Sequence, residues 1–176
     1  MKKYIYLLLF VLCFSMFGAN EKEGLNLEIT PKISFFMTKK QLEDSIKKSP
    51  VDSMIEESSK IYAYTDVPDM LNNVNKNASF LFADDQLLSS VFMKPSTLSE
   101  HKKIVNSYVN FFKNTPKNNL TKIENKNANA ILYYNNAMLL LVYYDKTNNS
   151  TVSVVQLANK ELLDMSCLLY TSDAAD

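Results

Sequence analysis

The strongest constraint on the fold is a pair of neighbouring segments between residues 130 and 144 that are apolar at nearly every position. "AILYY" and "AMLLLVYY" are separated by Asn135-Asn136, and asparagine tolerates the left-handed backbone of a two-residue hairpin turn. Pairing about that turn predicts two apolar faces. One face gathers Ile131, Tyr133, Met138, Leu140, Val142 and Tyr144, and the other gathers Leu132, Tyr134, Leu139, Leu141 and Tyr143. Since neither face is polar, we expect these strands to be central in a sheet and covered on both sides.

Three further segments have strand patterns. "TVSVVQL" at 151–157 follows the polar "DKTNNS" and extends the hairpin to a three-stranded meander. "KIYAYT" at 60–65 alternates like a strand. "ASFLFADDQLLSSVFM" predicts a second hairpin that turns at Asp84-Asp85-Gln86. Its expected faces hold Phe80, Phe82, Leu87 and Val91 on one side and Ser79, Ala83 and Ser90 on the other.

Two helices are predicted from capping boxes, in which a threonine and a residue three positions later satisfy each other's backbone donors. Thr38 precedes a helix over 39–48, and Thr97 precedes an amphipathic helix over 98–114. Pro50 favours a further short helix that ends at Glu57, because proline is tolerated at a first helical position. The Asn-rich segment 66–77 is expected to be irregular, 116–129 is polar, and another helix is expected to start at Asn159.

The order of these elements predicts an α+β fold, with a single antiparallel sheet of a hairpin plus a three-stranded meander packed against two or three helices. The length of 176 residues and an apolar content of 47% suit one domain. The helix over 98–114 can cover one face of the sheet through Ile104, Tyr108 and Phe112. The other face needs the N-terminal helices, C-terminal residues or a partner.

The N-terminus resembles a secretory signal peptide. Lys2 and Lys3 precede an apolar stretch of about fourteen residues, which is shorter than the roughly twenty that span a bilayer as a helix. We expect cleavage after Ala19, export to the periplasm or medium, and no stable transmembrane span afterwards. Cleavage after Gly18, an uncleaved anchor, or lipid attachment at Cys13 are alternatives.

The last ten residues, "CLLYTSDAAD", differ in composition from the body and look like translated sequencing-adapter DNA. The expected organisation is therefore a signal peptide at 1–19, a mobile lead at 20–32, a single α+β domain at 33–166 with a truncated C-terminus, and an adapter-derived tail at 167–176. With Cys13 in the signal and Cys167 in the tail, the domain lacks cysteine. A Cys nucleophile and a Cys/His zinc site are therefore not expected.

Composition argues against several other chemistries. The chain has 19 basic residues, all lysine, and 19 acidic residues, so its formal net charge is zero. Nucleic acid is not an expected partner, because there is neither a basic excess nor an arginine to read phosphates or bases. Two glycines in total could hardly build a phosphate loop or a nucleophile elbow. We predict no cofactor, no metal and no catalytic residue.

A histidine, a pair of aspartates and a set of tyrosines are the side chains of this chain that could carry a function. His101 is expected on a solvated helix surface, without a motif partner for acid–base catalysis. Asp84-Asp85 is expected as an exposed turn. The candidate partner-binding surface is a set of tyrosines, although aromatic pairing within a sheet is the favoured explanation for them. These tyrosines are Tyr133, Tyr134, Tyr143 and Tyr144.

Three stretches, "FFMTKKQLEDSI", "FLFADDQLL" and "AILYYNNAMLLLVYY", are similar to small exported bacterial α+β proteins of uncharacterised function. A fainter similarity is to the outer-membrane assembly lipoproteins, which have two helices before a sheet. These resemblances carry over no functional site. Our first hypothesis is a non-enzymatic exported module that binds another envelope component, either a protein or a peptidoglycan-associated one. Alternatives are a hydrolase whose catalytic residues lie beyond Ser166, or an exported peptidase inhibitor.

Overall fold

A computed structural model describes residues 28–56, 59–114, 120–135 and 138–157. Its centre is an eight-stranded sheet in the order β3-β4-β7-β8-β12-β11-β10-β9, in which every neighbouring pair is antiparallel. The strands are β3 (Asp52–Ile55), β4 (Lys60–Tyr64), β7 (Asn77–Ala83), β8 (Gln86–Pro95), β9 (Thr121–Asn125), β10 (Ala130–Tyr134), β11 (Met138–Asp145) and β12 (Ser150–Leu157).

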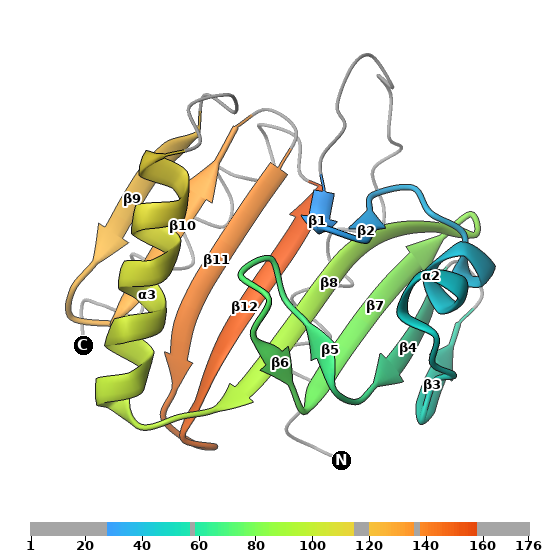
Figure 1. The fold of residues 1–176 in the computed structure, drawn as a ribbon, viewed down its shortest axis with the longest axis horizontal. Helices are drawn as coiled ribbons and strands as arrows, with labels where there is room; N and C mark the ends of the chain where they lie inside the picture. The colour runs from blue at the N-terminus through green and yellow to red at the C-terminus, as the bar shows by residue number, and fades with distance from the viewer. Residues whose placement is uncertain (1–27, 57–58, 115–119, 136–137, 158–176) are drawn as a thin grey trace.

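Two helices and two small hairpins lie on one side of this sheet, as Figure 1 shows, and we call that side the helix face. These elements are α2 (Lys39–Ile46), α3 (Leu98–Lys113), the hairpin of β1 (Glu28–Thr30) with β2 (Ile33–Ser34), and the hairpin of β5 (Val67–Pro68) with β6 (Val74–Asn75). Ile29 and Thr30, from the segment expected as a mobile lead, are buried.

The predicted fold class is wrong. The chain is mostly sheet, with three separate sheets and two described helices, where a single sheet against two or three helices was expected. The short helix expected between Pro50 and Glu57 is instead strand β3, which pairs with β4 from Asp52 opposite Ala63 to Ile55 opposite Lys60. The ladder with β4 satisfies backbone groups that one turn of isolated helix would leave exposed.

Besides β3, four strands arise where no strand was predicted, and one of them, β1, lies in the expected mobile lead. β5 and β6 come from the Asn-rich segment 66–77, and β9 comes from the polar segment before residue 130. β9 is an edge strand whose residues are mostly exposed. Such a strand is held by backbone hydrogen bonds to its neighbour and needs no buried face, so hydrophobic alternation does not reveal it.

The two helices predicted from capping boxes are confirmed. The helix expected to start at Asn159 lies outside the described residues. The side chains of Thr38 and Gln41 satisfy each other's backbone N–H groups at the start of α2, and Thr97 and Glu100 do the same for α3. α2 ends at Lys47, whose left-handed backbone (φ 53°) terminates the helix.

The sheet consists of two similar halves that meet at β8 and β12. In the first half, α2 is followed by β3, β4, β7 and β8; in the second, α3 is followed by β9, β10, β11 and β12. The last strands of the two halves pair antiparallel, from Ser150 opposite Pro95 to Gln156 opposite Ser89. The antiparallel pairing relates the halves by an approximate twofold rotation, although the sequence shows no repeat.

The hairpin of β7 and β8 turns at Asp84 and Asp85, both with positive φ, as expected for a tight two-residue turn. An irregularity between Leu81 and Phe82 shifts the register. Phe80, Phe82 and Leu87 share the helix face as predicted, but Val91 does not. Ser90, which lies opposite Phe80, replaces it there. The extra residue of a bulge reverses the side-chain alternation beyond it.

The hairpin of β10 and β11 has the two faces that the sequence predicts. Tyr134 lies opposite Leu139, and the N–H of Asn135 donates to the carbonyl of Met138 (3.0 Å). The midpoint between the paired residues therefore lies one residue beyond the midpoint of the predicted Asn135-Asn136 turn. Residues 136–137 are outside the described part of the chain. A register shift of two leaves every side chain on its predicted face.

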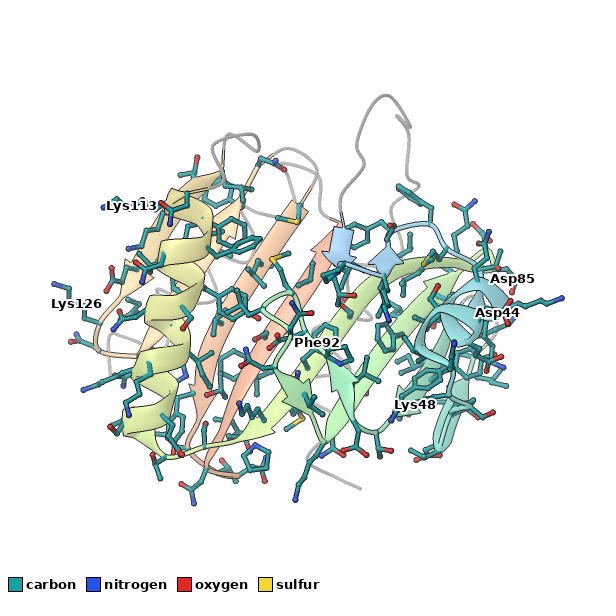
Figure 2. All side chains as sticks on the ribbon, in the orientation of Figure 1. Asp44, Lys48, Asp85, Phe92, Lys113 and Lys126 are labelled. Carbon is teal, nitrogen blue, oxygen red and sulfur yellow. The ribbon has the colours of Figure 1, made fainter. Side chains whose placement is uncertain are left out.

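Most of the core lies on the helix face, where side chains from both halves form one cluster with the helices and hairpins. Figure 2 shows Phe92 near the middle of this face. The charged side chains labelled there lie toward the two sides of the molecule: Asp44, Lys48, Asp85, Lys113 and Lys126.

The end of α2 provides a test of the fold. Lys47→Gly should raise the free energy of unfolding by about 0.5–1 kcal/mol, because glycine adopts the left-handed conformation without the steric cost of a Cβ atom. The matched control, Lys40→Gly inside the same helix, should lower it by about 1 kcal/mol. Urea denaturation measures both changes. Destabilisation by Lys47→Gly would contradict the position of the helix end.

Candidate functional site

The sheet surface opposite the helices, which we call the far face, carries a second apolar cluster. It is centred on Val91, Leu139, Leu141, Val152 and Val154, with partly buried Met93, Leu132, Tyr134 and Tyr143 around them. No described helix or small hairpin contributes an apolar side chain to this cluster. Four adjacent strands, β8, β12, β11 and β10, therefore carry a continuous apolar layer whose five central side chains are 1–7% exposed.

The four candidate tyrosines do not form one surface. Tyr133 is buried on the helix face, where its ring centroid lies 4.5 Å from that of Phe112. Tyr144 is on the same face, with its centroid 5.4 Å from that of His101. Tyr134 and Tyr143 lie on the far face. Strand alternation separates tyrosines that are adjacent in sequence, so two of the four can contact a partner of the far face.

Ser89 adds a polar group to the far face. It lies opposite Leu81 on β7 and Gln156 on β12, two residues from Val91. The residue is 3% exposed, and its hydroxyl has no hydrogen-bond partner among the described residues. A buried hydroxyl without a partner costs roughly 1–3 kcal/mol, so Ser89 lowers the stability of this part of the sheet.

His101 is buried, although the sequence analysis expected it on a solvated surface. Its Nε2 lies 2.6 Å from the carbonyl oxygen of Asn129 and its Nδ1 lies 3.1 Å from the hydroxyl of Thr151. A carbonyl only accepts, so Nε2 carries the proton and Nδ1 accepts from Thr151. Burial lowers the pKa of His101, against the opposing effect of the Asn129 carbonyl. The imidazole is thus neutral at pH 7.

The hydrogen-bond chain continues past His101. Because Thr151 donates to the imidazole, its oxygen accepts from the hydroxyl of Ser96 at 2.7 Å. The hydroxyl of Tyr144 lies 3.2 Å from the Ser96 carbonyl oxygen. This network attaches the first turn of α3 to β12 and to the loop before β10.

A second buried polar group lies further along α3. The Tyr108 hydroxyl donates to the hydroxyl of Ser153 (3.2 Å), and burial, followed by the nearby Asp69 carboxylate, raises the pKa of Tyr108. Asp69 accepts from the N–H groups of Leu71 and Asn73, both at 2.9 Å. The β5–β6 hairpin is thereby held against α3 and the central strand β12.

The helix face thus brings serine, histidine and aspartate onto one side of the sheet without the contacts of a catalytic triad. The partners of His101 are Thr151 and a backbone carbonyl, while Ser153 is bonded to Tyr108. Nucleophilic catalysis needs the base within hydrogen-bond reach of the nucleophile and oriented by a third group. The observed contacts attach α3 and the β5–β6 hairpin to the sheet.

Asp84 and Asp85 are exposed, and Asp85 forms an ion pair with Lys60 at 2.7 Å. Within the described ranges, no three His, Cys, Asp or Glu residues are grouped to hold a metal ion. The described helices are too short or too polar to cross a membrane.

Comparison of the chain with protein-family models, with curated proteins and with solved structures gave no match. Interpretation of the far face therefore depends on its geometry.

The buried imidazole predicts a pH dependence of stability. Because the folded-state pKa of His101 is lowered, its contribution is fully present above the ordinary histidine pKa of about 6.5 and is lost as pH falls below it. The free energy of unfolding should fall by up to about 1.4 kcal/mol per pH unit there. Urea denaturation between pH 7.5 and 5 measures the slope.

His101→Gln is the control, because it removes the only histidine of the chain. Its unfolding free energy should be lower at pH 7.5 but should vary less between pH 7.5 and 5. An unchanged slope would show that other groups cause the pH dependence.

Proposed function

We propose that this chain is an exported, non-enzymatic module of the bacterial envelope that binds another envelope protein through the far face. The observation that supports this proposal most is the apolar surface across β8, β12, β11 and β10, over which no described helix or small hairpin lies. Protein-binding surfaces typically have an apolar core enriched in aromatic residues and a polar rim.

The chemistry of the far face also favours binding. Tyr134 and Tyr143 provide large contact areas with polar ends, as tyrosine does in many protein interfaces. The polar groups of the helix face, in contrast, are engaged in bonds that hold α3 in place.

A photoreactive amino acid at Tyr134 tests the proposal directly. In cells that export the chain, illumination should attach one discrete envelope protein at position 134, because this residue lies at the rim of the far face. The control is the same amino acid at Phe111, which is 37% exposed on α3. Equal adducts from both positions, or none from Tyr134, would contradict binding through the far face.

Leu139 and Leu140 are adjacent residues of β11 on opposite faces, and both are buried. Leu140→Asp should unfold the domain, because an unpaired carboxylate in the main core costs several kcal/mol. Leu139→Asp, in the smaller of the two clusters, should also lower the free energy of unfolding, but by less than Leu140→Asp, and should lose the adduct formed at Tyr134. Circular dichroism and thermal denaturation report the folded state. Loss of folding in both variants would show that the far face is essential core.

Ser89→Ala should separate stability from binding. Removal of the unsatisfied hydroxyl should raise the free energy of unfolding by about 1 kcal/mol, and the adduct at Tyr134 should be unchanged, because a partner cannot reach the buried hydroxyl. Ser79→Ala, on the neighbouring strand of the same face, is the matched control and should change neither by much. A lower stability for Ser89→Ala would show that this hydroxyl is already satisfied.

A further inference from the structure

The eight-stranded sheet ends in two edge strands, β3 and β9. Among the described residues, β3 has β4 as its one strand neighbour and β9 has β10. An edge strand presents N–H and C=O groups that can pair with a strand of another chain. The two edges differ in whether these groups are already used and in which side chains flank them.

At the β3 edge, a carboxylate occupies one of the outward-facing groups. The N–H of Glu56 donates to the carbonyl of Ser59 (2.9 Å), in the register of the β3–β4 pair. Because hydrogen-bonded pairs alternate along an antiparallel ladder, the backbone of Ser53 faces away from β4. Its N–H donates instead to Oδ1 of Asp52 at 2.8 Å. A charged side chain in this position protects an edge from pairing.

At the β9 edge, the outward-facing groups belong to Lys122 and Glu124. The N–H of Asn135 donates to the carbonyl of Met138, which continues the register of β10 with β11. The same alternation, carried across β10, directs the backbone of Ile123 toward β10 and that of its two neighbours away from it. A second strand could therefore pair with these two residues.

The sequence of β9, "TKIEN", is complementary to itself in the antiparallel direction. We propose that β9 pairs antiparallel with β9 of a second copy of this chain, with Ile123 opposite Ile123 on the twofold axis. In this register Lys122 of each copy lies opposite Glu124 of the other. These two residues carry the outward-facing backbone groups, so each pair also exchanges both of its N–H···O bonds. Charge and backbone pairing thus favour the same register.

No other register of the two strands combines these features. A change of register by one residue would place outward-facing backbone opposite inward-facing backbone, and the ladder would not form. A change by two residues restores the ladder but places Lys122 opposite Lys122, or Glu124 opposite Glu124. Like charges directly opposite each other destabilise an antiparallel pair. Larger changes leave too few paired residues, so the side chains of β9 specify one dimer.

Ile123 gives the dimer an apolar centre. It is 43% exposed and lies opposite Leu132, on the far face. In the dimer it occupies a non-hydrogen-bonded position, where facing side chains are closest, so two exposed isoleucines cover each other. The Lys122–Glu124 ion pair within the strand (3.0 Å) joins side chains that are 38% and 42% exposed. Such a pair contributes little to stability, so its exchange for two pairs between the copies costs little.

The dimer repeats between two chains the pairing that exists within one. β8 and β12 pair antiparallel about a twofold axis normal to the sheet, and the β9 pair has the same symmetry. Both helix faces therefore lie on one side of a continuous sheet. β9 is at the outer edge of the molecule in Figure 1, where a second copy can approach it. The assembly is closed, because each copy uses the same strand.

Charge reversal tests the dimer in the full chain. Sedimentation equilibrium should show a monomer–dimer equilibrium for the unmodified protein. Lys122→Glu should weaken dimerisation at least about tenfold, because it places two like-charged pairs across the interface. Adding Glu124→Lys restores opposite charges and should return the dissociation constant to within about threefold of its original value. Circular dichroism checks that each variant is folded.

The control is Ile55→Asp at the β3 edge, where the isoleucine is 65% exposed. This variant should leave dimerisation unchanged. An unmodified chain that stays monomeric at about 1 mM would overturn the proposal. Weaker dimerisation of Ile55→Asp, or a double variant that dimerises no better than Lys122→Glu, would overturn it as well.

A disulfide tests the register independently. In the chain with Cys13→Ser and Cys167→Ser, Ile123→Cys should form a covalent dimer under mild oxidation, because facing Cα atoms at a non-hydrogen-bonded position are about 4.5 Å apart, within reach of a disulfide. Thr121→Cys, on the same face, is the control. The two Thr121 positions would lie about 13 Å apart and should cross-link at least about tenfold more slowly. Neither measurement involves an envelope protein, so the outcome is independent of the proposed function. Non-reducing electrophoresis measures both rates, and equal rates would contradict the dimer.

Discussion

The pairing of β8 with β12 is the interaction on which the rest of the structure depends. It joins residues far apart in sequence, such as Ser90 and Val155, whose side-chain hydroxyl and carbonyl oxygen are 3.4 Å apart. Each half of the chain is a local meander that would otherwise end in an unpaired edge. The seven residue pairs between these strands turn two four-stranded halves into one sheet. They also place the helices of both halves on the same side of the sheet. The reason is that the twofold axis that relates the halves is normal to the sheet, so each half keeps the same face toward the viewer.

The central pair is also where the sheet departs from a purely apolar core. Ser90, Thr151 and Ser153 are buried on the helix face, where aliphatic residues would add more hydrophobic stabilisation. Their hydroxyls instead meet the Val155 carbonyl, His101 and Tyr108. Hydrogen bonds are directional, so the bonds from Thr151 and Ser153 to α3 fix the position of this helix along β12. Non-directional apolar contacts would not fix it in this way. We infer that these residues set the position of α3 at some cost in hydrophobic burial.

The sequence predicts those parts of the fold that local patterns determine. The capping boxes locate both helices, and the doubly apolar hairpin at 130–144 identifies central strands with the correct faces. β3 and β9 are missed because edge strands depend on a neighbour and not on their own alternation. The face of Val91 is missed because the register shift near Leu81 depends on pairing. His101 is misplaced because its burial comes from Thr151 and Asn129, residues brought to it only by the assembled sheet.

The two faces of the sheet differ in the kind of contacts that their side chains make. On the helix face, α3 is joined to the strands by apolar packing and by buried hydrogen bonds, so it cannot leave without exposing polar groups. The far face carries only apolar side chains in its central cluster. Burying five such side chains contributes roughly 10 kcal/mol, which is comparable to the whole stability of a domain. A partner that uses the far face must therefore offer an apolar area of similar size.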